Sequence, residues 1–273
     1  MMNDTIITSI QNPKIKHLML LQQKSAERRK EGLFVVEGQR ELQHCIEGGY
    51  EVDSIFCCQE LADSQCPALR SSLLALLAKN AQLNTVSPKV YERMAYRGST
   101  EGVVALVRTK HRRLEDLQLS EHPLIIVLES VEKPGNLGAV LRSADAAKAD
   151  AVIVCDPLTD LYNPNLIRSS IGAIFTVPTV ACSSEECIRF LKERNIRILT
   201  AQLQDSRLYY DTDMREATAI VMGTESTGLT NQWREVADAH IRIPMLGRLD
   251  SLNVSVSAAI LLFEAVRQRE VES

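Results

Sequence analysis

Hydrophobic positions in the first third of the chain follow two spacings, one typical of helices and one typical of strands. Apolar residues that recur every three or four positions predict a helix over residues 14–23. Further helices are expected at residues 39–49, at 67–79 and from Ser87–Pro88 onward. Short apolar runs typical of buried strands lie at 33–38, 52–58, 83–86 and 103–107. These elements predict a small α/β sandwich over residues 1–108.

A second alternation of strands and helices follows a charged stretch, residues 109–121, which lacks an apolar period and is expected to be a linker. The candidate strands are 124–128, 151–155, 176–180, 196–200, 219–222 and 241–243. The candidate helices are 138–148, 164–173, 184–194, 229–237 and the amphipathic 254–269. Short apolar strands separated by helices predict a mostly parallel sheet that is covered on both faces. Residues 122–273 are therefore expected to form an α/β domain.

The composition is typical of a globular protein, with 45% hydrophobic and 24% charged residues among 273. No window approaches the roughly 18 apolar residues of a membrane span, and the N-terminus lacks the apolar segment of a secretory signal. We therefore expect a cytoplasmic protein with no membrane partner. The seven cysteines include no C-x-x-C pair and the five histidines are scattered, so neither a disulfide framework nor a bound metal is expected.

Positive charge is concentrated in the first part of a chain whose net charge is −4. Residues 1–113 contain 16 Lys and Arg against 12 Asp and Glu, whereas residues 114–273 contain 15 against 23. The basic residues cluster at 14–30 and 108–113, and such clusters can attract phosphates even on an acidic protein. A solvated helix face and a basic linker would show the same pattern. On charge alone, both interpretations stay open.

Three segments rich in Gly, Asn, Ser and Glu follow predicted strands of the second domain: 134–150, 221–229 and 243–260. The carboxyl ends of parallel strands are where ligands bind in such sheets. Two familiar phosphate-binding loops are not present. Gly135-Asn-Leu-Gly138 lacks the second glycine of a dinucleotide fingerprint, and the Gly223–Gly228 spacing is followed by Leu229 where a P-loop has lysine. A dehydrogenase and an NTPase are therefore disfavoured.

Taken together, the three segments carry N-x-G-x-x-x-R, then M-G-x-E-x-x-G-L, then I-P-M-x(5)-S-L-N-V-S-V-S. In this order they resemble the signature of the SpoU (TrmH-type) RNA ribose methyltransferases, which belong to the SPOUT class. The resemblance extends from about Leu124 to Arg267. The N-terminal region, with FVVEGQREL at 34–42, is similar to the L30e-like substrate-binding domain that precedes the catalytic domain in many members.

The resemblance implies a C-terminal segment threaded through a loop in a deep trefoil knot, with S-adenosylmethionine as the cofactor. It also implies a homodimer that packs the two knotted domains together, with residues of both subunits near each site. The cofactor residues that it implies are Thr200, Gly223, Ile243, Leu252 and Asn253. The RNA contacts expected from the basic clusters and from the stretch at 163–175 are Lys14, Arg28, Arg29, Lys30 and Arg168.

The resemblance makes Arg142 the central residue for methyl transfer to a ribose 2′-hydroxyl. A guanidinium rarely gives up a proton, so a phosphate clamp or stabilisation of an alkoxide is favoured over a general base, although the choice stays open. The other catalytic candidates are Asn136, Glu225, Ser251 and Asn253. Each has a simpler structural interpretation: Asn136 as the cap of a helix from 138, Glu225 as the cap of a helix near 229, and Ser251 or Asn253 as the cap of the last helix. No metal is needed for this chemistry.

Two alternatives to a ribosomal RNA (23S-type) substrate are considered. A transfer RNA enzyme is disfavoured because small members with that substrate usually lack the L30e-like domain. A non-catalytic RNA-binding assembly factor is disfavoured because Asn136, Arg142, Glu225, Ser251 and Asn253 are all present. Incorporation of methyl groups into RNA would separate these alternatives.

Overall fold

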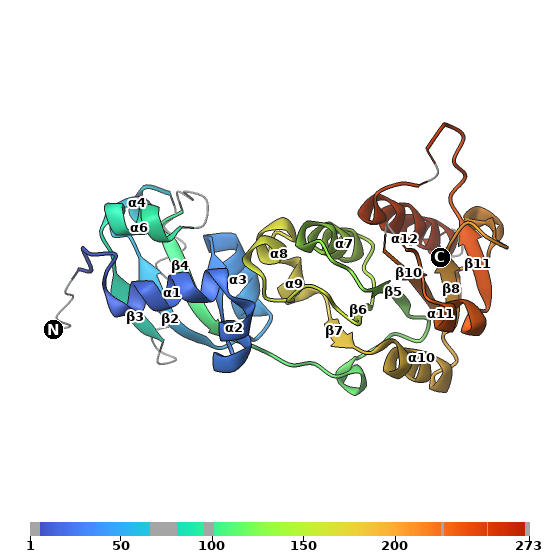
Figure 1. Cartoon of the computed structure of the whole chain (residues 1–273), viewed down its shortest axis with the longest axis horizontal. Helices are drawn as coiled ribbons and strands as arrows, with labels where there is room; N and C mark the ends of the chain where they lie inside the picture. The colour runs from blue at the N-terminus through green and yellow to red at the C-terminus, as the bar shows by residue number, and fades with distance from the viewer. Residues whose placement is uncertain (1–5, 66–80, 96–100, 225–226, 250, 271–273) are drawn as a thin grey trace. The chain divides into compact units, whose positions relative to one another are not determined.

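The computed structural model describes residues 6–65, 81–95, 101–224, 227–249 and 251–270. The chain forms two compact units (Figure 1). The first contains residues 1–110 and 161–176, and the second contains residues 111–160 and 177–273. Among the described helices, none combines the length and the hydropathy that crossing a bilayer requires.

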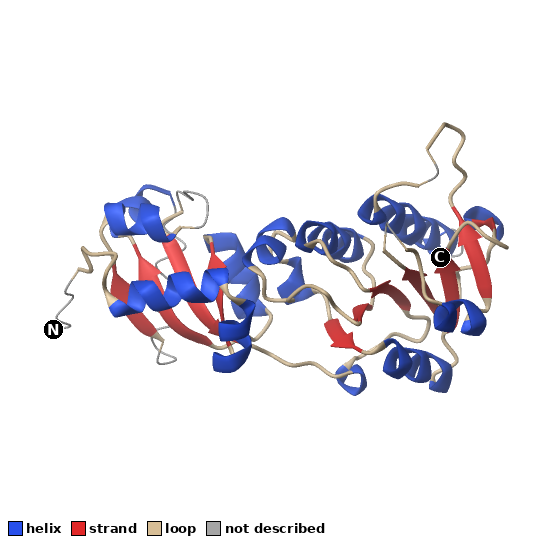
Figure 2. Ribbon diagram, in the orientation of Figure 1, coloured by secondary structure: helices blue, strands red, loops and turns tan. Residues whose placement is uncertain are grey.

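The first unit is built on a four-stranded sheet with helices packed on it (Figure 2). Its strands, in spatial order, are β1 (Leu33–Glu37), β4 (Val103–Arg108), β2 (Val52–Cys57) and β3 (Gln82–Thr85). β4 is antiparallel to both neighbours, and β2 is parallel to β3. Its helices are α1 (Pro13–Gln23), α2 (Ser25–Glu31), α3 (Gln39–Glu47), α4 (Gln59–Gln65) and α6 (Pro88–Met94). The four predicted strands are confirmed, and the helix predicted at 67–79 lies outside the described residues.

Local sequence explains where α1 begins and which face it buries. The side chain of Asn12 accepts a hydrogen bond from the Lys14 amide, and Pro13 occupies the first turn, where its missing N–H costs nothing. Ile15, Leu18 and Leu21 then recur at helical spacing and are fully buried against the sheet. The helix is therefore oriented by this apolar stripe, which leaves its basic residues on the other faces.

The segment 161–176 lies within the second domain in sequence but packs with the first unit. It contains α8 (Pro164–Ser169) and α9 (Ala173–Thr176), which contact β1 and α3. The ring of Tyr162 stacks on Phe34 with centroids 4.3 Å apart, and Phe175 packs edge-on against Tyr50 at 5.2 Å. The Tyr162 hydroxyl also donates to the Lys110 carbonyl and accepts from its amide. An aromatic cluster therefore attaches this segment to the first unit.

The second unit contains a sheet of seven parallel strands. In spatial order they are β7 (Thr179–Cys182), β6 (Ala151–Cys155), β5 (Leu124–Glu129), β10 (Thr218–Met222), β8 (Arg197–Ala201), β11 (Ala239–Arg242) and β9 (Arg207–Leu208). The central strands β5, β6 and β10 are buried along their whole length, which is why they appear in the sequence as uninterrupted apolar runs. The predicted parallel sheet is confirmed, with β9 as an additional edge strand.

The helices of this unit are α7 (Pro134–Ala146), α10 (Ser184–Glu193), α11 (Asn231–Val236) and α12 (Val254–Glu270). Short 3₁₀ turns occur at Leu114–Asp116 and Tyr209–Asp211. After β11, near one edge of the sheet, the chain returns so that α12 packs against α7 and contacts the central strands β5 and β10. This return path is compatible with the expected knot, which itself stays a prediction.

Candidate active site

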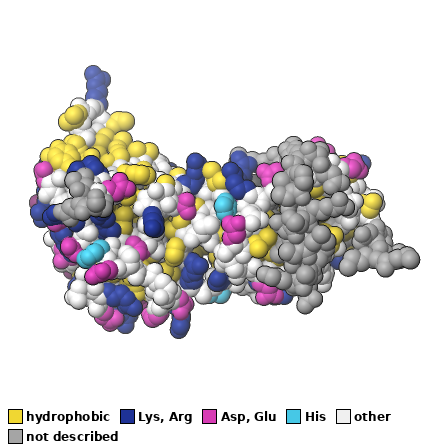
Figure 3. Space-filling view, turned by 180° about the vertical axis from the view of Figure 1, so that it is seen from behind, with side chains coloured by type: hydrophobic (Ala, Val, Ile, Leu, Met, Phe, Trp, Pro, Cys, Tyr) yellow, Lys and Arg dark blue, Asp and Glu magenta, His cyan; other side chains and the backbone are white. Residues whose placement is uncertain are grey.

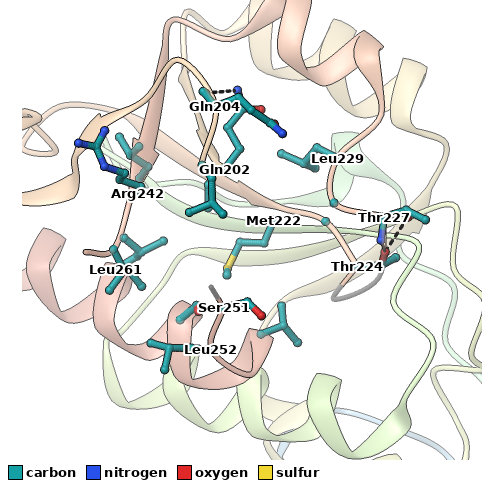
Figure 4. Close-up of a pocket in the computed structure, with 18 of the residues that line it drawn as sticks. Gln202, Gln204, Met222, Thr224, Thr227, Leu229, Arg242, Ser251, Leu252 and Leu261 are labelled. Carbon is teal, nitrogen blue, oxygen red and sulfur yellow. Dashed lines mark hydrogen bonds between the residues drawn. The ribbon is translucent and has the colours of Figure 1, made fainter. Parts of the chain in front are cut away.

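A cavity of about 400 Å³ lies at the carboxyl ends of β8, β10 and β11 (Figure 4). Its walls come mainly from four separate segments: 201–204, 222–224 with 227–229, 241–243 with Met245, and the residues around the start of α12. Each of the first three segments begins at the end of a parallel strand, which is where ligands are expected in such sheets. The cavity volume lies within the range of small-molecule sites.

Apolar side chains and polar atoms both contribute to the cavity wall. Met222, Leu229 and Leu261 are among the apolar side chains that line it. Gln202 Oε1 and Arg234 Nε are buried, and neither has a hydrogen-bond partner within the described part of the chain. Buried polar atoms are normally satisfied, so an acceptor and a donor left open in one cavity indicate a ligand with complementary groups. S-adenosylmethionine has both an apolar purine face and several polar groups, and the wall fits it.

The loop after β10 is held in a tight shape by close backbone contacts. A Cβ atom at Gly223 would lie 2.2 Å from the carbonyl carbon of Gly228, so only glycine fits there. The Thr227 amide donates to Thr224 Oγ1 at 3.0 Å, and the Gly228 amide donates to the Thr224 carbonyl at 3.1 Å. Glu225, the candidate carboxylate of this loop, lies outside the described residues. The loop therefore presents backbone groups to the cavity.

Glu129, a residue that the sequence analysis did not single out, anchors the far end of this loop. It is 3% exposed at the end of β5, and its carboxylate accepts hydrogen bonds from the Thr230 amide at 2.9 Å and the Thr230 hydroxyl at 2.6 Å. Ser184 Oγ lies 3.4 Å from the same carboxylate and accepts from the indole N–H of Trp233. An acidic residue closing a long apolar run, at 124–129, is the signal that could have identified it.

A smaller cavity of about 120 Å³ adjoins the first and shares Gly223, Thr224 and Val254 with it. Asn136 lines this second cavity, and its Oδ1 accepts a hydrogen bond of 3.2 Å from Asn253 Nδ2. Residues 117 positions apart, from the first and third motifs, are thus brought together. The arrangement places a polar pair beside the larger cavity.

The structure settles the capping interpretations of these two asparagines. Asn253 Oδ1 accepts from the Ser255 amide at 3.0 Å and from the Ser255 hydroxyl at 2.6 Å, so the prediction that Asn253 caps the last helix is confirmed. The prediction that Asn136 caps a helix from 138 is wrong. α7 begins at Pro134, a residue suited to the first helical position, so Asn136 lies inside the first turn and its side chain is available to Asn253.

The other candidate residues of the site differ in where they lie. Ser251, Leu252, Gly223 and Ile243 line the larger cavity. Thr200 does not line it: the side chain is fully buried, and its hydroxyl lies 2.6 Å from His240 Nδ1. Arg142 is exposed on α7 and lines neither cavity, and its side chain has no hydrogen bond or ion pair with the described residues.

The candidate RNA-binding residues all belong to the first unit, and one of them is buried. Arg28 is 3% exposed, and its guanidinium donates to the carbonyls of Leu21 (2.5 Å) and Gln22 (3.1 Å) at the junction of α1 and α2. The expected phosphate contact by Arg28 is therefore corrected to a structural role. The exposed basic residues of this set are Lys14, Arg29, Lys30 and, on α8, Arg168. The Nζ of Lys14 donates to Asn84 Oδ1.

The structure thus combines a small α/β unit with a parallel α/β sheet that has a ligand cavity at its strand ends. The chain belongs to the SpoU rRNA methylase family: residues 123–263 match the model of that family. Residues 12–105 match the MRM3-like substrate binding domain. The family and the enzyme class expected from the three motifs are thereby confirmed.

Known proteins of this family resemble the chain along most of its length. A 23S rRNA (uridine(2479)-2′-O)-methyltransferase of Streptomyces viridochromogenes is 30% identical over 89% of this chain and 85% of its own. A crystal structure of an RNA 2′-O ribose methyltransferase is 40% identical, with a TM-score of 0.82 over 97% of this chain and 99% of the other. The AdoMet-bound rRNA methyltransferase from Sinorhizobium meliloti is 27% identical, with a TM-score of 0.87 over 96% of this chain and 97% of its own. S-adenosylmethionine is accordingly the cofactor of this enzyme.

Proposed function

We propose that the protein methylates a ribose 2′-hydroxyl in ribosomal RNA, of the 23S type, with S-adenosylmethionine as the methyl donor. The observation that carries the proposal is the pair of adjoining cavities, one suited to the cofactor and one lined by Asn136. The 23S rRNA substrate of the Streptomyces relative supports the choice of RNA. The proposal also places the enzyme in the cytoplasm, because ribosomal RNA is made and modified in that compartment.

In this proposal the larger cavity holds the cofactor. Backbone groups of Gly223, Ile243 and Leu252 bind its adenine and methionine ends, and the polar atoms of Gln202 and Arg234 gain partners. Thr200 does not contact the cofactor directly in this proposal and acts by supporting neighbouring residues that line the cavity. When bound, S-adenosylmethionine supplies a methyl group on a sulfonium whose thioether is a good leaving group. Leu252 and Ser251 lie at the N-terminus of α12, where the helix dipole favours an anionic group such as the cofactor carboxylate.

The smaller cavity receives the target ribose. An in-line displacement needs the hydroxyl aligned about 3 Å from the methyl carbon, so the chain must hold the sugar rigidly. The paired amides of Asn136 and Asn253 supply a fixed acceptor and donor for this purpose, because each is already oriented by the other or by the helix cap. Arg142 clamps a phosphate of the target nucleotide and stabilises the developing alkoxide, and Glu225 is proposed to hold Arg142 or a backbone amide.

Exposed apolar side chains support a further part of the proposal, a homodimer through the C-terminal domain. The large hydrophobic side chains exposed around α12 and the loop before it are Leu246, Leu249, Leu252, Val256 and Phe263. In Figure 3 hydrophobic side chains gather near the protruding segment at the upper left. Soluble monomers rarely expose extended apolar patches, and Arg142 reaches neither cavity of its own chain. A second copy would cover the patch and complete each site, which light scattering of the full chain can test.

We further propose that residues 1–108 form an L30e-like RNA-binding domain, that 109–121 are a linker and that 122–273 form the methyltransferase domain. The match of residues 12–105 to a substrate-binding domain supports the first assignment. The exposed basic residues of the first unit support it as well. The segment 161–176 would then be an extension of the methyltransferase domain that packs with the RNA-binding unit.

Methylation of purified RNA tests the proposed function. The full-length protein should transfer a tritiated methyl group to undermethylated 23S rRNA, and cleavage-based mapping should place the mark on one ribose. If only transfer RNA were methylated, the proposed 23S rRNA substrate would be wrong and transfer RNA would take its place. Cofactor binding without transfer to any RNA would favour the non-catalytic assembly factor instead.

The buried and exposed arginines of α2 are expected to respond differently to substitution. A double variant Arg29→Ala/Lys30→Ala should weaken RNA binding and flatten its salt dependence, by about 0.9 in the slope of log K against log[salt] for each duplex phosphate that is no longer neutralised. The methylated nucleotide should stay the same, because phosphate contacts position and base contacts specify. Filter binding across a salt series measures the slope.

Arg28→Ala is the matched comparison for that experiment. It should lower the free energy of unfolding by about 1.5–3 kcal/mol, because two carbonyls lose a charged donor, and should leave the salt slope unchanged. Equal slopes for the double variant and the wild type would show that the exposed pair only faces solvent.

A further inference from the structure

Three cysteine side chains converge near one edge of the large sheet, and none of them lines either cavity. Cys155 ends β6 and Cys182 ends the neighbouring strand β7, and the two are partners in the strand register. Cys187 lies in the first half of α10, which follows β7 directly. The three Sγ atoms all lie within 4.8 Å of one another. Strand register and one helix thus bring three thiols together, although their spacing in the sequence does not predict it.

The surroundings of the cluster combine an apolar wall with an opening. Cys155 and Cys187 are fully buried in the hydrophobic core of the second unit, whereas Cys182 is half-buried. Asp156 and Glu186 lie close enough to act electrostatically on the Cys182 thiol. Both carboxylates already accept hydrogen bonds, Asp156 from Ser184 and Glu186 from Ser183. These carboxylates are therefore not offered as ligands. Their negative potential would still favour a cation at the cluster.

The separation of the sulfur atoms fits coordination of one ion better than a disulfide. A metal–sulfur distance near 2.3 Å places the sulfurs of a tetrahedral or trigonal site about 3.8–4.0 Å apart, so a contraction of about 1 Å or less suffices. A disulfide needs two sulfurs about 2.05 Å apart and would leave the third thiol unused, whereas Cys155, Cys182 and Cys187 form no disulfide in this structure.

We propose that Cys155, Cys182 and Cys187 form a three-thiolate site for one soft d¹⁰ cation, Zn²⁺ or Cu⁺. Thiolates select these ions over Mg²⁺ and Ca²⁺. On binding, each coordinating thiol loses its proton to solvent and forms one sulfur–metal bond, with no change of oxidation state. Zn²⁺ would take a water molecule as a fourth ligand, whereas Cu⁺ is satisfied by three sulfurs. The expectation that no metal is bound was based on spacing along the sequence, and such spacing does not reveal residues that become neighbours across strands.

A bound ion would act on structure rather than on methyl transfer. It would tie the ends of β6 and β7 to α10, whose first residue, Ser184, contacts Glu129 and Trp233. Because the ion binds the folded chain, it should raise the unfolding temperature as its concentration exceeds the dissociation constant.

The full-length protein, reduced and stripped with a chelator, is the material for the test. Zn²⁺ and Cu⁺ are added in separate arms, and Cd²⁺ is used as an optical probe because thiolate–cadmium bonds absorb in the ultraviolet. Native mass spectrometry should show one ion per chain. Cys182→Ser should weaken binding by more than the ~10–100-fold that loss of an outer-shell partner costs. The matched control is Cys45→Ser: Cys45 is buried in the first unit, and burial raises the pKa of its thiol, so binding should be unchanged.

A second measurement uses only the wild type and therefore does not depend on variants that fold. Alkylation of Cys182 in the folded chain should slow when Zn²⁺ or Cu⁺ is present. A stronger effect of one ion identifies which of the two occupies the site. Absence of stoichiometric binding, equal binding by Cys182→Ser and wild type, or formation of a disulfide without metal uptake would each overturn the proposal.

Discussion

Arg142→Ala is expected to lower the rate of methyl transfer by about 10²–10³-fold while the affinity for S-adenosylmethionine stays nearly unchanged. The size follows from the loss of one donor that stabilises charge in the transition state. The separation follows from the structure, because Arg142 is exposed on α7 and does not line the cofactor cavity. Exposed residues without partners contribute little to stability, so the variant should also unfold at the wild-type temperature.

Titration calorimetry with the cofactor, beside a tritiated-methyl assay, measures both quantities. Arg189→Ala is the matched control, since Arg189 is an exposed helical arginine of the same unit and should leave the rate unchanged. Arg142→Lys keeps the charge but loses the two-pronged geometry, so it should recover RNA affinity better than rate. A large loss of cofactor affinity in folded Arg142→Ala would place the residue on the cofactor side and contradict the assignment.

The parts of the fold that the sequence predicted well are those in which local pattern and burial agree. β5, β6 and β10 are buried on both faces, so their sequences are continuous apolar runs and their positions were evident. The site was evident for a different reason. Three motifs in the order of a known family carried a resemblance, and that resemblance implied Gly223, Ile243 and Leu252, which line one cavity.

Other features depend on contacts that no local pattern encodes. Arg28, Arg29 and Lys30 form one basic run, yet only Arg28 turns inward, because α2 places it against the carbonyl end of α1. Tyr162 and Phe175 were assigned with the second domain by order in sequence, but they pack on Phe34. Charge counts and strand periods cannot distinguish these cases, since both are decided by packing between segments.

The start of α7 is a case in which a local signal was present and was outweighed. Pro134 suits the first helical position, but the prediction began the helix at Gly138, with Asn136 as its cap. Packing of α7 against α12 accompanies the earlier start, although Gly135 and Gly138 have low helix propensity. The same packing brings Asn136 to Asn253, so the missed boundary and the polar pair of the site have one cause.

Gly223→Ala is expected to have the largest effect on the cofactor site itself. The added methyl group would lie 2.2 Å from the carbonyl carbon of Gly228 and 2.5 Å from the Leu229 amide nitrogen. Both atoms belong to the backbone, so no side-chain rotation relieves the clash and the loop must shift. Because this loop lines both cavities, the affinity for S-adenosylmethionine should fall by at least about tenfold, and overpacking should cost about 1–3 kcal/mol of unfolding free energy.

Gly135→Ala makes the same chemical change in the same unit and is expected to have the opposite sign. A Cβ atom at Gly135 meets nothing within 4 Å, and the residue lies in the first turn of α7. Replacing a helical glycine by alanine should add up to about 0.5–1 kcal/mol of unfolding free energy and leave cofactor affinity intact. Chemical unfolding of the cofactor-free proteins, followed by calorimetry, compares the two. If Gly223→Ala bound the cofactor as tightly as Gly135→Ala, the loop would be free to move away from Gly228, and its tight shape would not determine the cofactor site.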